Sequence, residues 1–522
     1  MKTNHGLFLV GCSALALAGC GPTDISSPGT GGNVVINPPA PAPTPAPTPT
    51  PTSSGVVAAA GCPNIGGSST FLGDSGIVTS SQGSWRVCTL PARISTSVTL
   101  PKIAGLLYSM NGRVDVGTDA GFSSTGTNVT LTIEPGVVVF GNTGTSWLAV
   151  NRGNKINAVG TATQPIIFTS RDNVLGLNGE TSQGQWGGVV LMGRAPITDC
   201  TTGAVASGGT ASTCERQTEG AADPALYGGT NSADSSGVMK YVQIRYSGFV
   251  LGSNSELQAL TLEGTGSGTE LDYIQSYNSS DDGAEFFGGT VNMKHYIAVG
   301  ADDDSLDMDT GVQANLQYLL LIQRAGAGDG LMELDSNGNE AQTPRQVSRM
   351  SNVTAIQTAT SSNNEANAQA SLFFRGNSDI SLYNSVIYTP NNQCIRMNGS
   401  GGSASATLTA RSVVMTCSGT GDASFIGSGA YTASQVAGFF GSGSNGNNAA
   451  FTSSLTGGFI NGANETAVTP FDVTSLSSFF SAVTYIGAVK DSSDTWYAGW
   501  TCNSGAANFG STSTACTALP TT

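Results

Sequence analysis

Short runs of apolar and β-branched residues recur along most of the chain, and each run is broken by Gly, Asn, Asp or Ser. Almost no long stretch shows the 3.6-residue apolar period of an amphipathic helix. Runs of three to six such residues between turn-forming residues predict strands. Examples are "NVTLTIEPGVVVFGN" (128–142), "WGGVVLMGRAPI" (186–197) and "SLFFRGNSDISLYNSVIY" (371–388).

The runs repeat with a period of about 22 residues. Three segments align without gaps at their cores, "ELDYIQSYNSSDDGAEFFGG", "MKHYIAVGADDDSLDMDTG" and "NLQYLLLIQRAGAGDGLMELD", and this alignment places Tyr273, Tyr296 and Tyr318 in equivalent positions. A β-rich repeat of this length predicts the coils of a parallel β-helix, in which inward side chains of successive turns stack on one another. The expected fold class is therefore all-β.

The first nineteen residues predict a lipoprotein signal peptide (1–19). Lys2 precedes an apolar stretch of about 12 residues, shorter than the roughly 20 that a membrane-spanning helix needs. Leu17-Ala18-Gly19-Cys20 is the pattern of a bacterial lipobox, so Cys20 is the expected lipidation site. Acyl chains on Cys20 would anchor the protein to outer-membrane lipid. An aspartate directly after the lipidated cysteine usually retains a lipoprotein in the inner membrane. This chain has Gly21 there, so we expect the protein in the outer membrane, exposed on the cell surface, or in the extracellular space.

The region after Cys20 predicts a lipidated Pro/Thr-rich tether over 20–55. Its segment "PPAPAPTPAPTPTPT" (38–52) should be an extended polyproline stalk. Beyond it we expect an N-terminal cap (56–120), the β-helix (121–430) and a C-terminal capping region (431–522). In that last region Asp472 caps a short helix within 471–483, and Trp496 and Trp500 help to close the end.

Cysteine usage predicts four disulfides. After removal of the signal peptide and lipidation of Cys20, eight cysteines remain, and an even number in an exported chain indicates a disulfide framework. No C-x-x-C motif suggests zinc. Proximity along the chain favours pairing of sequence neighbours: Cys62 with Cys88, Cys200 with Cys214, Cys394 with Cys417, and Cys502 with Cys516.

The chain is acidic, with a formal net charge of −15 at pH 7 and only 11% charged residues. The sequence has no cluster of basic residues that could bind phosphate groups, and an acidic surface repels nucleic acid. Nucleic acid is therefore excluded as a partner. Acidic surfaces attract divalent cations instead.

Several phrases resemble a family of bacterial exported lipoproteins with a right-handed parallel β-helix, found on the surfaces of proteobacteria and Bacteroidetes. The phrases are "LTIEPGVVVFG", "RGNKINAVGTATQPIIFTS", "YGGTNSADSSGVMKYVQIRYSGF" and "SSDDGAEFFGGTVNMKHYIAVGADDDSLDMDTG", and the likeness covers roughly 125–345. The resemblance implies the fold and the cell-surface address, with type II secretion as a route. It implies little about activity.

The segment "DDDSLDMDTG" (302–311) concentrates acids in one coil. Because neighbouring coils lie about 4.8 Å apart, Glu285, Asp307 and Asp329 would form a column if they were in register. Calcium accepts six to eight oxygen ligands and suits such a site. A calcium site and a solvated acidic turn remain the two alternatives. The candidate calcium ligands are Asp282, Glu285, Asp302, Asp304, Asp307 and Asp309.

An enzymatic interpretation competes with a binding one. Carboxylates on adjacent coils suit glycoside hydrolysis, but the G-H-G and R-I-K elements of polygalacturonases are missing. Calcium-binding aspartates with Arg324 or Lys294 as base would suit a polysaccharide lyase, and the strand residue His295 would have to serve any catalytic triad. We expect a non-enzymatic surface protein that contacts polysaccharide or envelope proteins, with the lyase or hydrolase acting on acidic polysaccharide as the alternative.

Overall fold

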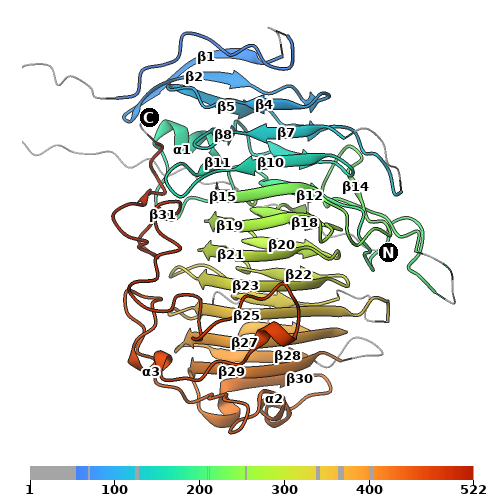
Figure 1. The fold of residues 1–522 in the computed structure, drawn as a ribbon, viewed down its shortest axis with the longest axis vertical. Helices are drawn as coiled ribbons and strands as arrows, with labels where there is room; N and C mark the ends of the chain where they lie inside the picture. The colour runs from blue at the N-terminus through green and yellow to red at the C-terminus, as the bar shows by residue number, and fades with distance from the viewer. Residues whose placement is uncertain are drawn as a thin grey trace, which may run out of the picture. The chain divides into compact units, whose positions relative to one another are not determined.

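A computed structural model describes residues 55–68, 71–123, 128–207, 210, 212–252, 255–336, 341–361, 370–398 and 405–520. Cys20 and the proline-rich tether lie outside the described residues. The fold is an all-β parallel β-helix (Figure 1). Among the described residues, no helix has both the length and the apolar character needed to span a membrane.

The larger of the two main sheets, here called sheet I, has 15 strands. Their pairing is parallel throughout, apart from the antiparallel pair at the N-terminal edge. The main path contains β1 (Gly73–Ser80), β2 (Gly83–Thr89), β5 (Leu106–Met110), β8 (Val138–Gly141), β11 (Ile166–Ser170), β15 (Gly237–Arg245), β19 (Glu270–Tyr277), β21 (Asn292–Val299), β23 (Gln313–Ile322), β25 (Gln346–Ile356), β27 (Ser378–Thr389) and β29 (Thr407–Cys417). Beside it lie β4 (Val98–Leu100), β7 (Thr130–Ile133) and β10 (Lys155–Val159).

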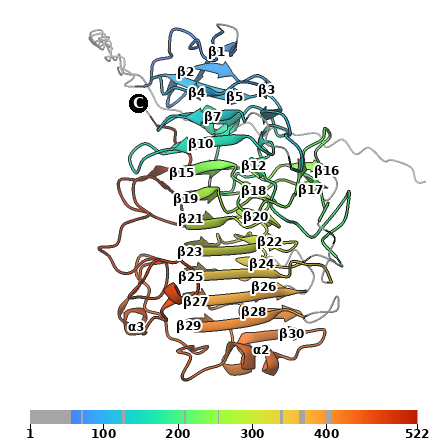
Figure 2. The same ribbon diagram turned by 45° about the vertical axis from the view of Figure 1, so that its right-hand side comes forward.

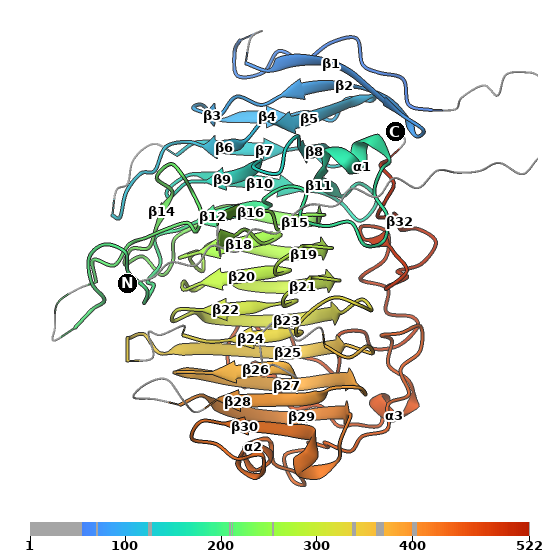
Figure 3. The ribbon, with the colours of Figure 1, turned by 180° about the vertical axis from the view of Figure 1, so that it is seen from behind.

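The second main sheet, sheet II, has 11 parallel strands and stacks alongside sheet I (Figure 3). Its order is β3 (Arg93–Ile94), β6 (Arg113–Val116), β9 (Trp147–Val150), β12 (Val189–Met192), β18 (Leu260–Glu263), β20 (Ala284–Phe287), β22 (Asp307–Asp309), β24 (Met332–Leu334), β26 (Ala370–Arg375), β28 (Gln393–Asn398) and β30 (Phe425–Ser428). Apolar side chains from both sheets fill the interior, as Phe286, Met308 and Leu334 do with no exposed surface. The predicted stacking of coils is thus confirmed.

A left-handed residue forms one corner of each later coil. In the earlier coils this corner is a loop between separate strands, β7 and β8 or β10 and β11, whereas β15 and its successors run through it without a break. The strand pairing skips the corner residue: Lys240 pairs with Asp272 and Val242 with Ile274. Positive φ is uncommon outside glycine, so its recurrence marks a built-in feature of the coil. The corner residues are Tyr241, Tyr273, His295, Tyr318, Asn352, Asn384 and Ser412.

The positions of the corner residues show that the predicted alignment of Tyr273, Tyr296 and Tyr318 was wrong at Tyr296. Tyr241, Tyr273, His295 and Tyr318 stack face to face, with ring centroids 4.2 to 4.7 Å apart. Tyr296 does not join this stack, because it lies one residue past the corner, is fully buried, and donates a hydrogen bond to the Ser305 carbonyl at 3.1 Å. The repeat is therefore 22 and then 23 residues, and the tyrosine alignment was wrong by one residue in its middle coil.

The two ends of the solenoid are closed by different elements. Parallel coils already begin with β2, β3, β5 and β6, well before residue 121, and β1 covers their outer edge. At the other end, η1 (Gly421–Ser424) and α2 (Ala433–Phe440) close the core, where Phe440 packs against Phe425. Thr432 caps α2 through a capping box.

Residues 441–520 run back along sheet I instead of closing the end, and we call them the strap (Figures 1 and 2). They contain α3 (Ala463–Thr466), η2 (Val473–Ser475) capped by Asp472 as predicted, β31 (Cys502–Asn503) and β32 (Thr514–Ala515). The strap reaches the N-terminal coils, where the Leu519 backbone N–H donates to the side-chain oxygen of Gln82 at 2.7 Å. Trp496 and Trp500 pack on the tyrosine corner, so the expected capping role is wrong for this part.

Buried polar side chains of sheet I satisfy the backbone of the irregular strap. Gln275 exchanges two hydrogen bonds with the Cys502 backbone, at 2.7 and 3.1 Å. Arg245, fully buried, donates to the carbonyls of Cys516 and Ala518 at 2.7 and 2.8 Å. Burial lowers the pKa of Arg245 to about 10. The strap is therefore fastened to the solenoid by specific hydrogen bonds as well as by apolar contact.

Residues 198–236 leave the solenoid as a long loop beside sheet II. It contains β13 (Arg216–Gln217) and β14 (Leu226–Tyr227), and Tyr227 packs against Phe287 of sheet II. α1 (Arg171–Leu175) precedes this loop in the chain, and the hairpin of β16 (Val250–Gly252) and β17 (Ser255–Glu256) follows it. The four disulfides join the predicted sequence neighbours: Cys62–Cys88, Cys200–Cys214, Cys394–Cys417 and Cys502–Cys516.

Candidate functional site on sheet II

Acidic side chains line up on the outer face of sheet II. Successive residues of a strand point to opposite faces, so the inward Phe286 and Met308 leave their neighbours facing outward. The strand register pairs Glu285 with Asp307 and Asp307 with Glu333. We call the outward acids of this region the acidic face: Asp281, Asp282, Glu285, Asp307, Asp309, Glu333 and Asp335.

The register corrects one member of the predicted column. Glu285 and Asp307 are neighbours as expected, but Glu333 and not Asp329 continues the row. The turn before β24 is longer than the turn before β22, so a constant spacing of 22 residues fails there. Asp329 lies within that turn, where its carboxylate accepts a hydrogen bond from Ser361 at 3.1 Å.

Two overlapping groups on this face have carboxylate oxygens within 4.8 Å of one another. One is Asp281, Asp282 and Glu285, and the other is Glu285, Asp307 and Asp309. Four of the six predicted calcium ligands therefore come together around Glu285. Asp304 adjoins them, because its backbone N–H donates to the Asp282 carboxylate at 2.9 Å.

Asp302 lies apart from the acidic groups. Its carboxylate accepts a hydrogen bond from Gln183 at 2.5 Å and lies 4.0 Å from the Arg324 guanidinium. Arg324 also donates to the side chain of Gln183. Asp302 thus belongs to a polar cluster at the turn between the two sheets.

Burial and mutual repulsion make the acidic face hard to ionise. Burial, followed by the charge of Asp303, raises the pKa of Asp281 to about 7. The pKa values of Glu285, Asp307 and Asp309 are also raised, first by burial and then by neighbouring carboxylates. Two charges 4.8 Å apart repel by about 3.5 kcal/mol at an effective dielectric of about 20. A proton or a cation is needed to relieve this repulsion.

Asp309 has a buried carboxylate oxygen that no group of the described residues satisfies. The residue is 6% exposed, and its Oδ1 atom is buried without a hydrogen-bond partner among the described residues. Buried polar groups are nearly always partnered, and an unpaired buried charge is more costly still. The carboxylate lies in the same group as Glu285 and Asp307, so one cation would satisfy all three.

Arginines border the acidic face on the C-terminal side. Arg375 forms ion pairs with Glu333 at 2.7 Å and with Asp335 at 2.6 Å. Arg375 and Arg396 lie over the Phe373 ring, 5.1 and 4.5 Å from its centroid. Acidic, aromatic and basic side chains therefore succeed one another along the same face of sheet II.

The sequence analysis missed several members of this face. Asp281 was passed over in favour of Asp282, although the two acids adjoin in "SSDDG". Glu333 and Arg375 were missed because the 22-residue period was extended past a longer turn. The signal was the alternation in "MELD" (332–335), which repeats the outward acids of "LDMD" (306–309).

The residues considered for catalysis do not join the acidic face. Lys294 and His295 lie on sheet I, where Lys294 donates to Ser481 at 2.9 Å. His295 Nδ1 lies 2.7 Å from the Asp272 carboxylate, with its ring stacked between Tyr273 and Tyr318. The expected combination of these residues with the acids is therefore not assembled.

The comparison with known families agrees with the fold. The model of the pectate-lyase-like β-helix domain matches residues 108–501, so the chain belongs to this family. No curated protein and no solved structure showed a significant match. The family assignment is consistent with a protein that acts on polysaccharide.

Proposed function

We propose that this protein binds acidic polysaccharide on the outer face of sheet II through a bound divalent cation, with calcium as the best fit. The single observation that carries the proposal is the buried, unpartnered Oδ1 of Asp309 beside Glu285 and Asp307. Calcium takes carboxylate oxygens in flexible geometry and keeps positions open for other oxygens. A bound cation also reverses the local sign of the charge, so that a polyanion is attracted.

The neighbouring arginines support an anionic ligand. Arg375 and Arg396 lie on strands next to the acidic face and stack on Phe373. A guanidinium fork recognises a carboxylate in two-point fashion. A chain of uronate sugars can thus contact the cation at one point and arginine at the next.

Retention on immobilised polygalacturonate tests the proposal. We expect retention in calcium and release in chelator, with the double variant Asp307→Asn/Asp309→Asn losing at least tenfold in affinity in calcium. Asp302→Asn is the matched control, because it removes an acid of the same loop that lies outside the two groups. Retention that is unchanged in the double variant contradicts the proposal.

Polysaccharide cleavage is the second candidate, favoured by the family match and by the closeness of Arg375 to the acids. Elimination needs a base, but the ion pairs with Glu333 and Asp335 favour the protonated guanidinium. Binding without cleavage is therefore the better supported function. The assay is formation of unsaturated uronate from polygalacturonate in calcium, and product that disappears in Arg375→Gln would establish the lyase instead.

The cellular address in this proposal rests on the sequence. The Leu17–Cys20 lipobox and the proline-rich tether support a lipid-anchored protein of the outer membrane surface, with type II secretion as the export route. Four disulfides suit an oxidising compartment. In this arrangement the partners are membrane lipid, polysaccharide and envelope proteins. Cys20→Ser should move the protein from the membrane fraction to the soluble fraction, and an unchanged membrane fraction would rule out the anchor.

A further inference from the structure

Two hollows flank the disulfide-closed loop of the strap, on sheet I and away from the acidic face. The smaller, about 220 Å³, is lined by Glu180, Tyr277, Asn278 and Arg324 together with loop residues 504–506. The larger, about 430 Å³, shares the same three loop residues. Loop 504–506 is thus a common wall between two adjoining hollows.

The larger hollow adds polar and aromatic groups from successive coils. Gln323, Thr358 and Tyr388 come from the solenoid, and Phe459 comes from the strap. None of these four side chains carries a charge. Uncharged hydrogen-bonding groups beside aromatic rings are the usual lining of a site that holds a small polar molecule.

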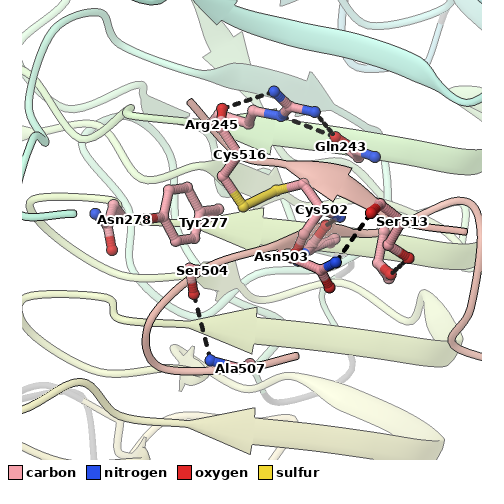
Figure 4. Close-up of a disulfide and its surroundings, with 12 residues drawn as sticks. Gln243, Arg245, Tyr277, Asn278, Cys502, Asn503, Ser504, Ala507, Ser513 and Cys516 are labelled. Carbon is pink, nitrogen blue, oxygen red and sulfur yellow. Dashed lines mark hydrogen bonds between the residues drawn. A yellow bond between two sulfur atoms is a disulfide. The ribbon is translucent and has the colours of Figure 1, made fainter. Parts of the chain in front are cut away.

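The shared wall is held in place from several sides. The Cys502–Cys516 disulfide closes the loop, and Tyr277 packs in the same apolar cluster as this disulfide (Figure 4). The Gly505 backbone N–H donates to the Glu180 carboxylate at 2.8 Å. The Ser504 backbone N–H donates to the Ala507 carbonyl at 2.9 Å, and the Ala507 backbone N–H donates to the Ser504 hydroxyl at 3.3 Å. Both hollows are therefore formed before any ligand arrives.

Two residues that line the smaller hollow each carry a buried polar atom without a partner among the described residues. One is the Oδ1 acceptor of Asn278, a residue that is 1% exposed, and the other is the Nε donor of Arg324. The Asn278 amide nitrogen is already used, since it donates to the carbonyls of Glu180 and Ser182 at 2.8 and 3.1 Å. One unsatisfied acceptor and one unsatisfied donor in the same hollow match the hydroxyl groups of a sugar, which donate and accept.

The charged side chains of the smaller hollow indicate which kind of sugar it would bind. Glu180 and Arg324 bring one negative and one positive group to the smaller hollow, so the site attracts neither a cation nor a polyanion. Tyr388, which is only half-buried, supplies a ring in the larger hollow against which a sugar can lie. We propose that the paired hollows at loop 504–506 bind a short stretch of neutral glycan, as a second carbohydrate site independent of the cation-dependent face of sheet II.

Blocking the shared wall tests this proposal. Ala506 is exposed, so Ala506→Trp fills both hollows without disturbing the core, and Ala430→Trp places the same bulk on an exposed turn at the far end of the solenoid. The probes are cellotetraose, xylotetraose and mannotetraose, measured by titration calorimetry in chelator. We expect at least one to bind the full-length protein, with at least a tenfold loss in Ala506→Trp and none in Ala430→Trp.

The outcomes separate the two sites. Asp307→Asn/Asp309→Asn should bind the neutral probe like the unaltered protein, and Ala506→Trp should still bind polygalacturonate in calcium. A single cooperative unfolding transition, at a temperature no lower than that of the parent, shows that each variant keeps the fold. Failure of all three probes to bind, or binding that is equal in Ala506→Trp, overturns the proposal, and so does loss of neutral-probe binding in the acidic double variant.

Discussion

Replacing Asp309 by asparagine removes one charge from the acidic face while keeping the shape of the side chain. Carboxylate oxygens of Glu285 and Asp307 lie within 4.8 Å of it, and each such pair repels by about 3.5 kcal/mol at an effective dielectric of about 20. Protonation already relieves part of this repulsion, because the pKa of Asp309 is raised by burial and by Asp335. In chelator at pH 8, Asp309→Asn should therefore unfold at a higher temperature than the parent.

Calcium should raise the Tm of the parent far more than that of Asp309→Asn. A ligand at about 100 times its Kd stabilises the folded state by about 2.7 kcal/mol. In a chain of this size about 1 kcal/mol corresponds to roughly 1 °C in Tm, because the unfolding entropy grows with length. Calorimetry should show a calcium-dependent rise of about 3 °C in the parent and in Asp302→Asn, but less than 1 °C in Asp309→Asn. An equal rise in Asp309→Asn, or a lower Tm than the parent in chelator, would refute the reasoning.

Two further predictions concern pH and the strap. A carboxyl group whose pKa is higher in the folded state than in the unfolded state destabilises the fold as the pH rises between those two values. Because the pKa of Asp281 is raised to about 7, the Tm in chelator should fall between about pH 4 and pH 8. Calcium should flatten that fall, and a Tm that increases over this range would contradict the assignment. Removing Cys502–Cys516 should cost more than removing Cys200–Cys214, although both span 14 residues. Loop entropy predicts a loss of about 3 kcal/mol of stability for either disulfide. Only the loss of Cys502–Cys516 also loosens backbone carbonyls that accept hydrogen bonds from the buried Arg245. Denaturant unfolding checks this, and equal losses would show that the strap contributes no more than loop closure.

The sequence predicted the coils because inward apolar positions recur in every turn and each turn has few ways to close. It did not predict the exact register at Tyr296, because the left-handed corner of that coil is His295 instead of a tyrosine and the next corner, Tyr318, follows after 23 residues instead of 22. The column beyond Asp307 failed for a similar reason, because a longer turn moved Glu333 into the place expected for Asp329. Period alone fixes the fold but not the residue that occupies each position.

The strap was harder to predict than the solenoid. Its sequence is rich in Gly, Ser and Asn and has no apolar period, so composition indicated only loops. Its path depends on partners hundreds of residues away, such as Gln275 for Cys502 and Arg245 for Cys516. Contacts of this kind involve single polar side chains, which leave no pattern along the chain.

Anomalous diffraction from crystals grown with calcium tests the central claim most directly. The account predicts a peak between Glu285, Asp307 and Asp309, with metal–oxygen distances of about 2.3–2.6 Å, and loss of that peak in Asp309→Asn. Well-ordered crystals in saturating calcium with no peak on this face, or with the same peak in the variant, would contradict it.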